Sequence, residues 1–459
     1  MKRRNSLKWA AVAAGTLAAT TCATNTQAQS ADALLDKLVD KGILSQKEAN
    51  ELRDESDAGF RKAYQVKSGM PDWVTALKIN GDFRARYENF NSENDSDRRN
   101  DGILNNNAFV DRSRFRYRLR LGVVASIKDN FEVGLRLSSS EANGSFGGDP
   151  ISGNTTMQDN GSKKFVYLDL AYGKWNFINT RAITSALTIG KMENPFLFSD
   201  AVFDADYTPE GAGYNLTYRL NDQHTLKLNA GAFVLDELGG ESNDPWMYGA
   251  QVRWDATWSP AIASSLGLAG LNIVHEQQLT NSAVPAVNRG NSRDAGTLPL
   301  SRNFNPIIAD ASFTYSFVDG VPFYKAAFPI KIAGEYMNNV AASSRNEAWQ
   351  AGVTFGKAGK KGLWELSYRY KNLEGDAWYE ELTDSDFGAY YQGTFPNSGS
   401  GAGYGSGTNV RGHIAKFSYS PYDALTLGVT YFRTTLINET PVGSSSDMSR
   451  LQVDAVLKF

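Results

Sequence analysis

From residue 77 to the C-terminus, the chain repeats stretches of about ten residues in which apolar and polar side chains alternate. In the last nine residues, every odd position from Leu451 to Phe459 is apolar, and the even positions are polar apart from Val456. This alternation predicts a β-strand with one apolar and one polar face. Its length suits the roughly 9–11 residues with which a tilted strand crosses a bilayer. Taken alone, however, the stretch fits the edge strand of a soluble sandwich equally well.

The same pattern predicts sixteen strands, of which 186–192 and 264–274 alternate least clearly. The connections between these strands differ in length: the turns at 128–130 and 421–424 are short, whereas a loop such as 374–409 is long. Short turns on one side and long loops on the other are the sequence signature of a transmembrane β-barrel. The candidate strands are 77–87, 111–127, 131–141, 164–175, 186–192, 211–220, 225–235, 246–258, 264–274, 306–317, 329–338, 347–356, 363–373, 410–419, 425–434 and 449–459.

We therefore expect an all-β fold, a closed antiparallel transmembrane β-barrel of about sixteen strands formed by residues 73–459. An unpaired sheet edge is not viable in hydrocarbon, so the strand at 449–459 must pair with the strand at 77–87. Aromatic residues at apolar positions near the strand ends, such as Tyr87 and Trp254, suit the aromatic girdles of a membrane barrel. A soluble sandwich would also alternate, but it would not need so many strands in one series without a domain break.

Residues 1–28 have the features of a secretory signal peptide. Four cations precede an apolar stretch, and a small-x-small cleavage site ends at Ala28. A lipoprotein cut before Cys22 is the alternative, although Thr21 is a poor residue at that cut. Cleavage after Ala28 removes four cations and no acids, so the net charge goes from −3 to −7 and no cysteine remains. A negative net charge does not favour nucleic acid as a partner. The expected location of the protein is the cell outer membrane.

Residues 29–72 are predicted to form a periplasmic helical hairpin and a polar linker. The apolar residues of 34–39 have helical spacing, and Gly42 stands where a helix C-cap is expected. Ser45 and Glu48 then form a capping box that opens a second short helix. Because the hairpin is too small to bury a core alone, we expect it to contact copies of itself or the cell wall, or to be a plain lead-in to the barrel. No run of the sequence approaches the roughly 18 apolar residues of a transmembrane helix.

The stretch from Arg112 to Leu121 places five arginines on one side of a strand and apolar residues on the other. An arginine that faces lipid at mid-membrane costs about 2–4 kcal/mol. Five would cost on the order of 10 kcal/mol, which is comparable to the stability of a whole domain, so the row must face the barrel interior. A solvated face of an ordinary sheet is one alternative, and binding of anionic lipid head groups by Arg112 and Arg114 is another. The predicted basic wall of the pore consists of Arg84, Arg86, Arg112, Arg114, Arg116, Arg118, Arg120 and Arg136.

A second charged stretch, between the fifth and sixth candidate strands, holds five acids and two prolines where the alternation is interrupted. Its segments 190–196 (GKMENPF) and 206–211 (DYTPEG) resemble the family described simply as putative porins, and the layout of 77–459 resembles the sixteen-stranded porins of Gram-negative bacteria. In such porins, the loop after the fifth strand folds into the barrel and narrows it. The resemblance therefore implies that the acids of this stretch stand opposite the row from Arg112 to Arg120. These constriction-loop acids are Glu193, Asp200, Asp204, Asp206 and Glu210.

The predicted function is a water-filled channel for passive diffusion of small hydrophilic solutes and ions, without catalytic residues, metal or cofactor. Fixed opposite charges across a narrow aqueous constriction would create a transverse field that orders polar solutes. The three histidines, His224, His275 and His413, lie far apart in the sequence and lack metal-ligand spacing. Two alternatives remain: a structural protein that ties the outer membrane to the cell wall through residues 31–56, and a lipid hydrolase with a Ser/His pair on the outer barrel face, for which His413 is the candidate.

The resemblance also implies partners. Outer-membrane lipids surround such a barrel, and similar porins are often homotrimers. By the same resemblance, the terminal aromatic residue Phe459 is the signal that the barrel-assembly machinery recognises. The hairpin predicted within 29–72 is not part of the general porin pattern, so trimer contacts cannot be carried over to it. The transported solute, the pore radius and the sign of ion selectivity are left open.

Overall fold

The computed structural model describes residues 70–92, 112–143, 146–240, 242–280, 284–285, 289–294, 299–388, 406–438 and 447–459. The predicted signal peptide and nearly all of the predicted hairpin and linker lie outside these residues. The chain separates into two compact units, and the larger one, Ala76–Phe459, contains nearly all of the described residues. In the part of the chain that the structure describes, no helix is long and apolar enough to cross a membrane.

The larger unit is one antiparallel sheet with its connections. Each predicted strand is present. The ends of most strands differ from the prediction by a few residues, because alternation locates the middle of a strand better than its ends. The described residues also contain a two-residue strand, β4 (Thr155–Thr156), and the short 3-10 turns η1 (Lys128–Asn130), η2 (Asp159–Gly161) and η3 (Glu276–Gln278). The long strands are β1 (Val74–Ser92), β2 (Arg112–Ile127), β3 (Phe131–Ser139), β5 (Val166–Asn179), β6 (Ile183–Lys191), β7 (Glu210–Arg219), β8 (His224–Val234), β9 (Trp246–Ser259), β10 (Ile262–Val274), β11 (Pro306–Phe317), β12 (Phe328–Asn339), β13 (Glu347–Gly356), β14 (Trp364–Leu373), β15 (Val410–Tyr422), β16 (Leu425–Leu436) and β17 (Met448–Lys458).

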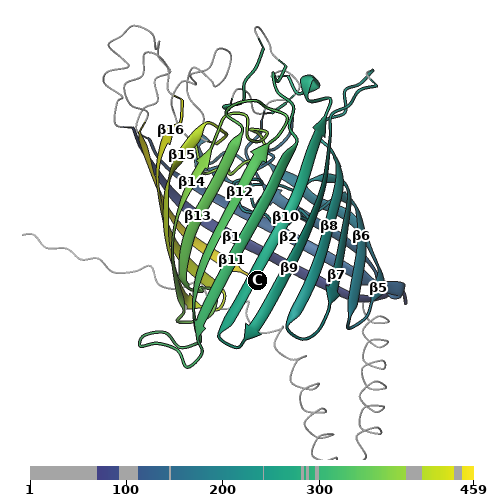
Figure 1. The fold of residues 1–459 in the computed structure, drawn as a ribbon, viewed down its shortest axis with the longest axis vertical. Coiled ribbons are helices and arrows are strands. Elements are labelled where there is room, and N and C mark those ends of the chain that lie inside the picture. Colours follow the sequence, from purple (N-terminus) through teal and green to yellow (C-terminus); the bar gives the residue numbers. More distant parts are fainter. Residues whose placement is uncertain are drawn as a thin grey trace, which may run out of the picture. The chain divides into compact units, whose positions relative to one another are not determined.

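The sheet closes on itself (Figure 1). Strand β17 pairs with β1 in an antiparallel register that runs from Asp82 opposite Lys458 to Ser92 opposite Met448. Strand β1 also pairs with β2, β3 pairs with β5, and each later strand pairs with the next one along the chain. The sixteen long strands therefore form a ring without a free edge, as a barrel in hydrocarbon requires. The predicted closed barrel, and the pairing of its last strand with its first, are confirmed.

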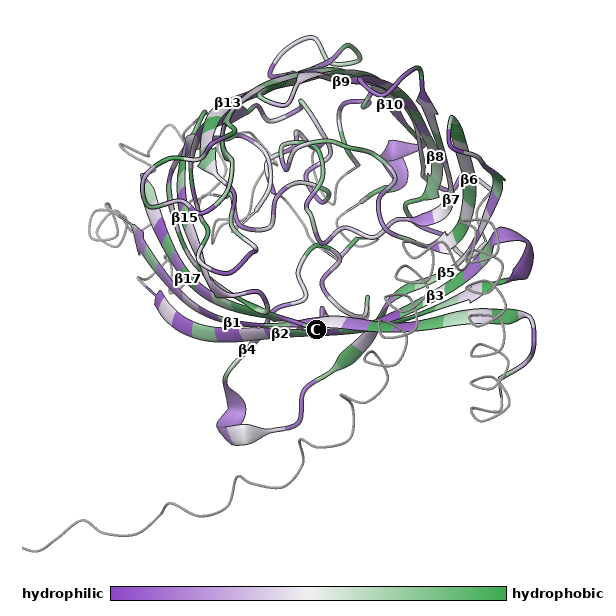
Figure 2. Cartoon of the chain, turned by 90° about the horizontal axis from the view of Figure 1, so that it is seen from below, coloured by the Kyte–Doolittle hydropathy of each residue, from purple (hydrophilic) through white to green (hydrophobic). Residues whose placement is uncertain are grey.

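The outer face of the barrel is apolar. On β2, Phe115, Leu119 and Leu121 are 59%, 46% and 44% exposed, whereas Arg116 and Arg118 between them are buried. Apolar side chains on the outer face thus alternate with polar side chains on the inner face along this strand. Several strand ribbons are likewise banded green and purple in Figure 2. A protein surrounded by water rarely exposes such a belt of large apolar side chains, whereas lipid covers the belt of a membrane barrel.

Aromatic side chains gather near the strand ends on the outer face. Their rings pair at both ends of the barrel, which is the arrangement predicted for girdles at two membrane interfaces. The pairs include Phe131–Trp175 (5.5 Å between ring centroids) and Trp254–Trp258 (5.7 Å) near the short turns, and Tyr87–Phe115 (5.1 Å) and Trp246–Tyr248 (6.2 Å) near the long loops.

Apolar side chains also fill part of the interior. Three of the long connections, 192–209, 275–305 and 374–409, contribute described residues that pack against inward-facing residues of strands β8 to β14, and ribbon segments cross the inside of the ring in Figure 2. From the sequence, only the first of these connections was assigned to the interior. We call the resulting cluster the plug; it consists of Met192, Phe196, Val202, Phe203, Phe233, Met247, Ala269, Leu271, Ile273, Leu279, Val284, Leu300, Phe304, Ile308, Met337, Ala348, Leu373, Ala377, Trp378, Tyr379 and Leu382.

The C-terminal residue closes the barrel against a glycine of β1. Phe459 and Gly81 exchange backbone hydrogen bonds of 3.0 and 3.1 Å. A Cβ atom on Gly81 would lie 2.4 Å from the carbonyl oxygen of Arg120 and 2.5 Å from the ring of Phe459. Substitution Gly81→Val should therefore displace Phe459 and weaken the seam between β17 and β1. We expect a smaller fraction of the protein to migrate as the compact, heat-modifiable band on a detergent gel.

The matched control for this substitution is Gly173→Val. Gly173 lies on the outer face of β5, and an added Cβ there would meet no atom within 4 Å. This variant should keep the mobility of the unmodified protein. A Gly81→Val protein that folds as completely as Gly173→Val would show that the contact between Phe459 and Gly81 does not matter for closure.

Candidate functional site

The arginines of the predicted basic wall lie on neighbouring strands. Because β1 pairs with β2, and β2 with β3, Arg84 on β1, the row on β2 and Arg136 on β3 face one region of the interior. Burial follows the alternation: Arg86 and Arg118 are 5% and 7% exposed. Arg112 is different, because it is the first residue of β2 and is exposed.

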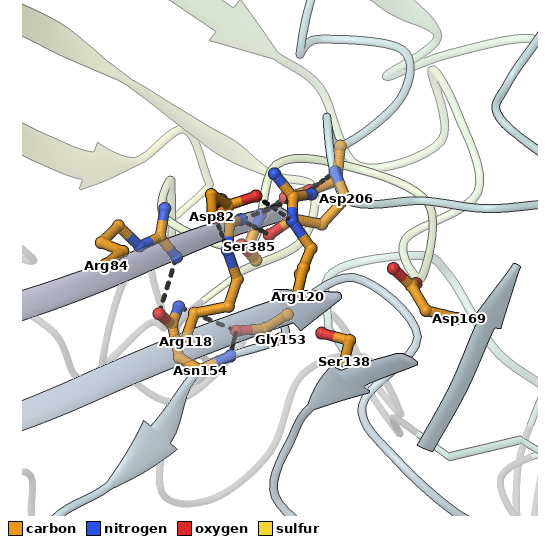
Figure 3. Close-up of polar contacts among 12 residues, drawn as sticks. Asp82, Arg84, Arg118, Arg120, Ser138, Gly153, Asn154, Asp169, Asp206 and Ser385 are labelled. Carbon is orange, nitrogen blue, oxygen red and sulfur yellow. Dashed lines mark hydrogen bonds and ion pairs between the residues drawn. The ribbon is translucent and has the colours of Figure 1, made fainter. Parts of the chain in front are cut away.

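Two carboxylates bridge Arg118 and Arg120 (Figure 3). Arg118 approaches Asp82 at 2.9 Å and Asp206 at 2.7 Å, and Arg120 approaches the same carboxylates at 2.6 and 3.2 Å. Asp82 belongs to β1, whereas Asp206 belongs to the connection 192–209. Charge-assisted hydrogen bonds of this length are among the strongest side-chain contacts, so they fasten this connection to the arginine wall. We call these four residues the constriction cluster.

Asp82 was not among the site residues predicted from the sequence. The sequence nevertheless indicated that Asp82 faces the interior, because Asp82, Arg84 and Arg86 occupy alternate positions of one strand and therefore share one face. A second network of ion pairs lies further along the same strands, toward the long loops. It joins Glu88 to Arg114 at 2.6 Å and to Arg450, and it joins Arg86 to Asp386 at 2.9 Å and to Asp454 at 2.7 Å.

Of the five predicted constriction-loop acids, Asp206 is the one that contacts the arginine row of β2. Glu193 instead contacts Arg136 on β3, which also binds Asp169 of β5. Glu210 is the first residue of β7 and pairs with Lys191 on the adjacent β6 at 3.0 Å. The implied alignment of all five acids against Arg112–Arg120 is therefore wrong for these two.

Asp200 and Asp204 are also placed away from the arginine row. Asp200 contacts Lys371 at 2.8 Å and Arg369, both on β14. Asp204 accepts a hydrogen bond of 2.6 Å from the backbone N–H of Ser385. Burial, together with the neighbouring carboxyls of Asp206 and Asp384, raises the pKa of Asp204 well above its usual range. The connection 192–209 therefore crosses the barrel: Asp206 binds one wall, and Asp200 binds another.

The described part of the connection 374–409 is a second interior segment, and it was not predicted from the sequence. Its Asp384 contacts Lys371 at 3.1 Å, and its Asp386 contacts Arg86 at 2.9 Å and Arg450 at 2.7 Å. A signal did exist: residues 376–386 combine acids with Trp378 and Tyr379, as 193–210 combines acids with aromatics. Composition alone could not show that both segments fold inward, because neither has strand periodicity.

Aromatic contacts join the interior segments of the connections 192–209, 275–305 and 374–409. The Phe203 ring lies 5.5 Å from that of Tyr207 and 6.0 Å from that of Trp378, measured between centroids. Trp378 in turn lies 6.2 Å from Phe304. The backbone N–H of Asp204 also donates to the carbonyl of Leu382 at 2.8 Å. The plug thus positions Asp206 against the arginine wall.

Two cavities meet at the constriction cluster. One, of about 1020 Å³, is lined mainly by strand residues on the side of the short turns, and we call it the inner cavity. The other, of about 640 Å³, is lined largely by the long loops, and we call it the outer cavity. Arg118, Arg120 and Asp206 line both. These three side chains therefore stand where a solute would pass from one cavity into the other.

A closed barrel with an apolar outer belt and a charged internal constriction defines a channel-type β-barrel of the outer-membrane class. Residues 61–277, just under half of the chain, match the model of the family described as "Putative porin". This match confirms the predicted resemblance to that family.

Solved structures similar to the chain include OprB of Pseudomonas putida, at 10% identity and a TM-score of 0.49, covering 88% of this chain and 97% of that one. OmpF of Salmonella typhi, at 10% identity and a TM-score of 0.44, covers 83% and 97%, respectively. The outer membrane channel DcaP of Acinetobacter baumannii, at 14% identity and a TM-score of 0.43, covers 83% and 97%. No curated protein sequence matches the chain.

Proposed function

We propose that the protein is an outer-membrane porin, a water-filled channel through which small hydrophilic solutes and ions diffuse passively. The observation that carries this proposal is that two cavities inside a closed barrel meet at Arg118, Arg120 and Asp206. The apolar outer belt and the family match support the same function. Diffusion through such a path needs no covalent chemistry.

The constriction cluster would select solutes by charge and size. Its guanidinium groups belong to β2, and the Asp206 carboxylate contacts them from the connection 192–209, so opposite fixed charges lie side by side at the edge of the passage. In walls of low dielectric, such charges create a field stronger than the same charges would create in water. A dipolar solute can align with this field, whereas an apolar solute must displace ordered water. Selectivity then depends on the width and the charge of the passage.

The alternatives receive less support. His413, the candidate for a lipid hydrolase, is on the outer face of β15, where its ring contacts the hydroxyl of Tyr368 at 2.7 Å and packs against Tyr370. Neither partner is a nucleophilic serine. The cell-wall anchor depends on residues 31–56, which lie outside the described part of the chain. A homotrimer, lipid contacts of the outer belt and recognition of Phe459 by the assembly machinery remain part of the proposal.

Swelling of proteoliposomes tests the proposed function. Liposomes that contain the full-length protein should swell in isotonic solutions of neutral sugars, and the rate should fall steeply as the sugar grows from a pentose to a tetrasaccharide. The size dependence follows because the constriction, not the inner cavity, limits the passage. Swelling no faster than that of protein-free liposomes would refute the channel.

A further inference from the structure

Arg84 differs from the other arginines of the basic wall in what it contacts. Its guanidinium donates a hydrogen bond of 2.6 Å to the side-chain oxygen of Asn154, a neutral acceptor (Figure 3). Within the described residues, no carboxylate lies at ion-pair distance from it. The other inward arginines of this wall each approach a carboxylate: Arg86, Arg114, Arg116, Arg118, Arg120 and Arg136.

The neighbouring charges do not supply the missing partner. Arg84 is flanked by two cations, Arg86 and Arg118, and the carboxylates of Asp206 and Asp386 lie nearby but not at ion-pair distance. The carboxylates closest to these neighbours are already engaged: Asp454 accepts two hydrogen bonds from Arg86, and Asp206 accepts two from Arg118. A partly buried guanidinium without a counter-charge costs free energy that an ion pair would offset. The site is therefore arranged to be completed by an anion from outside the protein.

The position of Arg84 makes it reachable by a solute. It lines the inner cavity of about 1020 Å³ together with the constriction cluster. The hydrogen bond to Asn154 uses its Nη2 group, and its Nη1 group makes no hydrogen bond within the described residues. On β1, Arg84 lies between Asp82 of the constriction cluster and Arg86, so a solute in the inner cavity next to this cluster can reach it.

We propose that Arg84 binds the anionic group of a permeating solute, a carboxylate or a phosphate, in the inner cavity next to the constriction cluster. This inference rests on the proposed channel function and adds to it the class of solute, small organic or inorganic oxyanions. The planar guanidinium presents paired N–H donors that match two oxygens of such a group. Asn154 holds the guanidinium in place without neutralising it, so the charge stays available to the solute.

The test measures block of single channels by an oxyanion. The full-length protein is inserted in planar bilayers in KCl, and succinate or inorganic phosphate is added as the probe. Added probe should reduce the open-channel current of the unmodified protein in a saturable manner. For Arg84→Gln, the half-blocking concentration should rise about tenfold, as expected for loss of a charge-assisted contact. The backbone pairing of position 84 with Val456 does not depend on the side chain, so the strand should persist in this variant.

Two further variants make the result specific. Lys331 on β12 lines the same cavity and is exposed, so Lys331→Gln removes one charge without touching the site and should change the half-blocking concentration less than about twofold. Arg84→Lys keeps the charge but loses the paired donors, and it should raise this concentration about threefold.

Three outcomes would overturn the proposal. In the first, Arg84→Gln, or Arg84→Lys if the first variant does not fold, is blocked as readily as the unmodified protein. In the second, Arg84→Gln and Lys331→Gln weaken block equally, which would reflect only the cavity's overall charge. In the third, the unmodified protein conducts KCl but neither probe blocks it. Absence of any KCl conductance would instead refute the proposed channel function itself.

Discussion

Replacing Arg118 and Arg120 together by serine should make the channel strongly cation-selective. The double variant removes two positive charges and leaves Asp82 and Asp206 without their partners at the point where the two cavities meet. Two uncompensated carboxylates in a low-dielectric passage attract cations and repel anions. We expect the ratio of chloride to potassium permeability, obtained from the reversal potential in a KCl gradient, to fall roughly tenfold, which corresponds to about 1.4 kcal/mol.

The opposite pair of substitutions provides the internal check. Asp82→Ser with Asp206→Ser should shift the ratio toward chloride, and the quadruple variant should return it close to the original value with a larger conductance. Arg181→Ser is the matched surface control, because Arg181 and Asp222 form an ion pair in which both side chains are at least 90% exposed. A permeability ratio that stays the same in both double variants would mean that the constriction cluster is not the narrowest charged part of the path.

Removing the indole of Trp378 should open the passage. Trp378 is fully buried in the plug and contacts both Phe203 and Phe304. Truncating a buried tryptophan to alanine typically costs about 3–5 kcal/mol. Loops with few backbone pairings belong to the parts of a protein that open locally at the lowest free-energy cost, so this loss should loosen the plug. The barrel strands keep their hydrogen bonds, so Trp378→Ala should still insert in membranes. Its single-channel conductance should rise on the order of twofold, with noisier open levels, because the constriction is wider and less rigid.

Two variants separate loss of the plug from loss of a tryptophan. Trp378→Phe keeps an aromatic ring against Phe203 and should conduct nearly as the unmodified protein does. Trp258→Ala removes a tryptophan that is 48% exposed on the outer face, and its conductance should not change. Unchanged conductance and noise in a folded Trp378→Ala protein would show that the plug does not hold the connection 192–209 at the constriction.

Much of the barrel could be predicted because one physical constraint acts on every strand. A wall between lipid and water requires alternation, so ranges such as 306–317 and 347–356 coincide with β11 and β13 as they stand in the structure. The same constraint indicated which face of β2 carries its arginines, because five guanidinium groups in lipid would cost on the order of 10 kcal/mol. Where β1 ends was less predictable, because the strand continues to Ser92 beyond the clear alternation.

The pairing of each arginine could not be predicted in the same way. Asp386 and Asp454 reach Arg86 from 300 and 368 residues further along the chain, and only the closure of the barrel and the inward fold of a loop bring them there. The sequence of an interior loop has no periodicity that would indicate whether the loop folds into the barrel or away from it. The contact between Phe203 and Trp378 helps to position the connection 192–209, and it depends on two segments whose sequences do not indicate that they meet. This is why the resemblance placed five acids opposite the arginines although one of them, Asp206, contacts Arg118 and Arg120.

Single-channel recording in planar bilayers tests the central claim most directly. The purified full-length protein, shown to be folded by a heat-dependent shift on a detergent gel, is added to a bilayer bathed in KCl. An open path through the constriction cluster predicts stable, stepwise increases in current whose size scales with salt concentration. A folded protein that inserts but produces no current steps would contradict a continuous aqueous path through Arg118, Arg120 and Asp206.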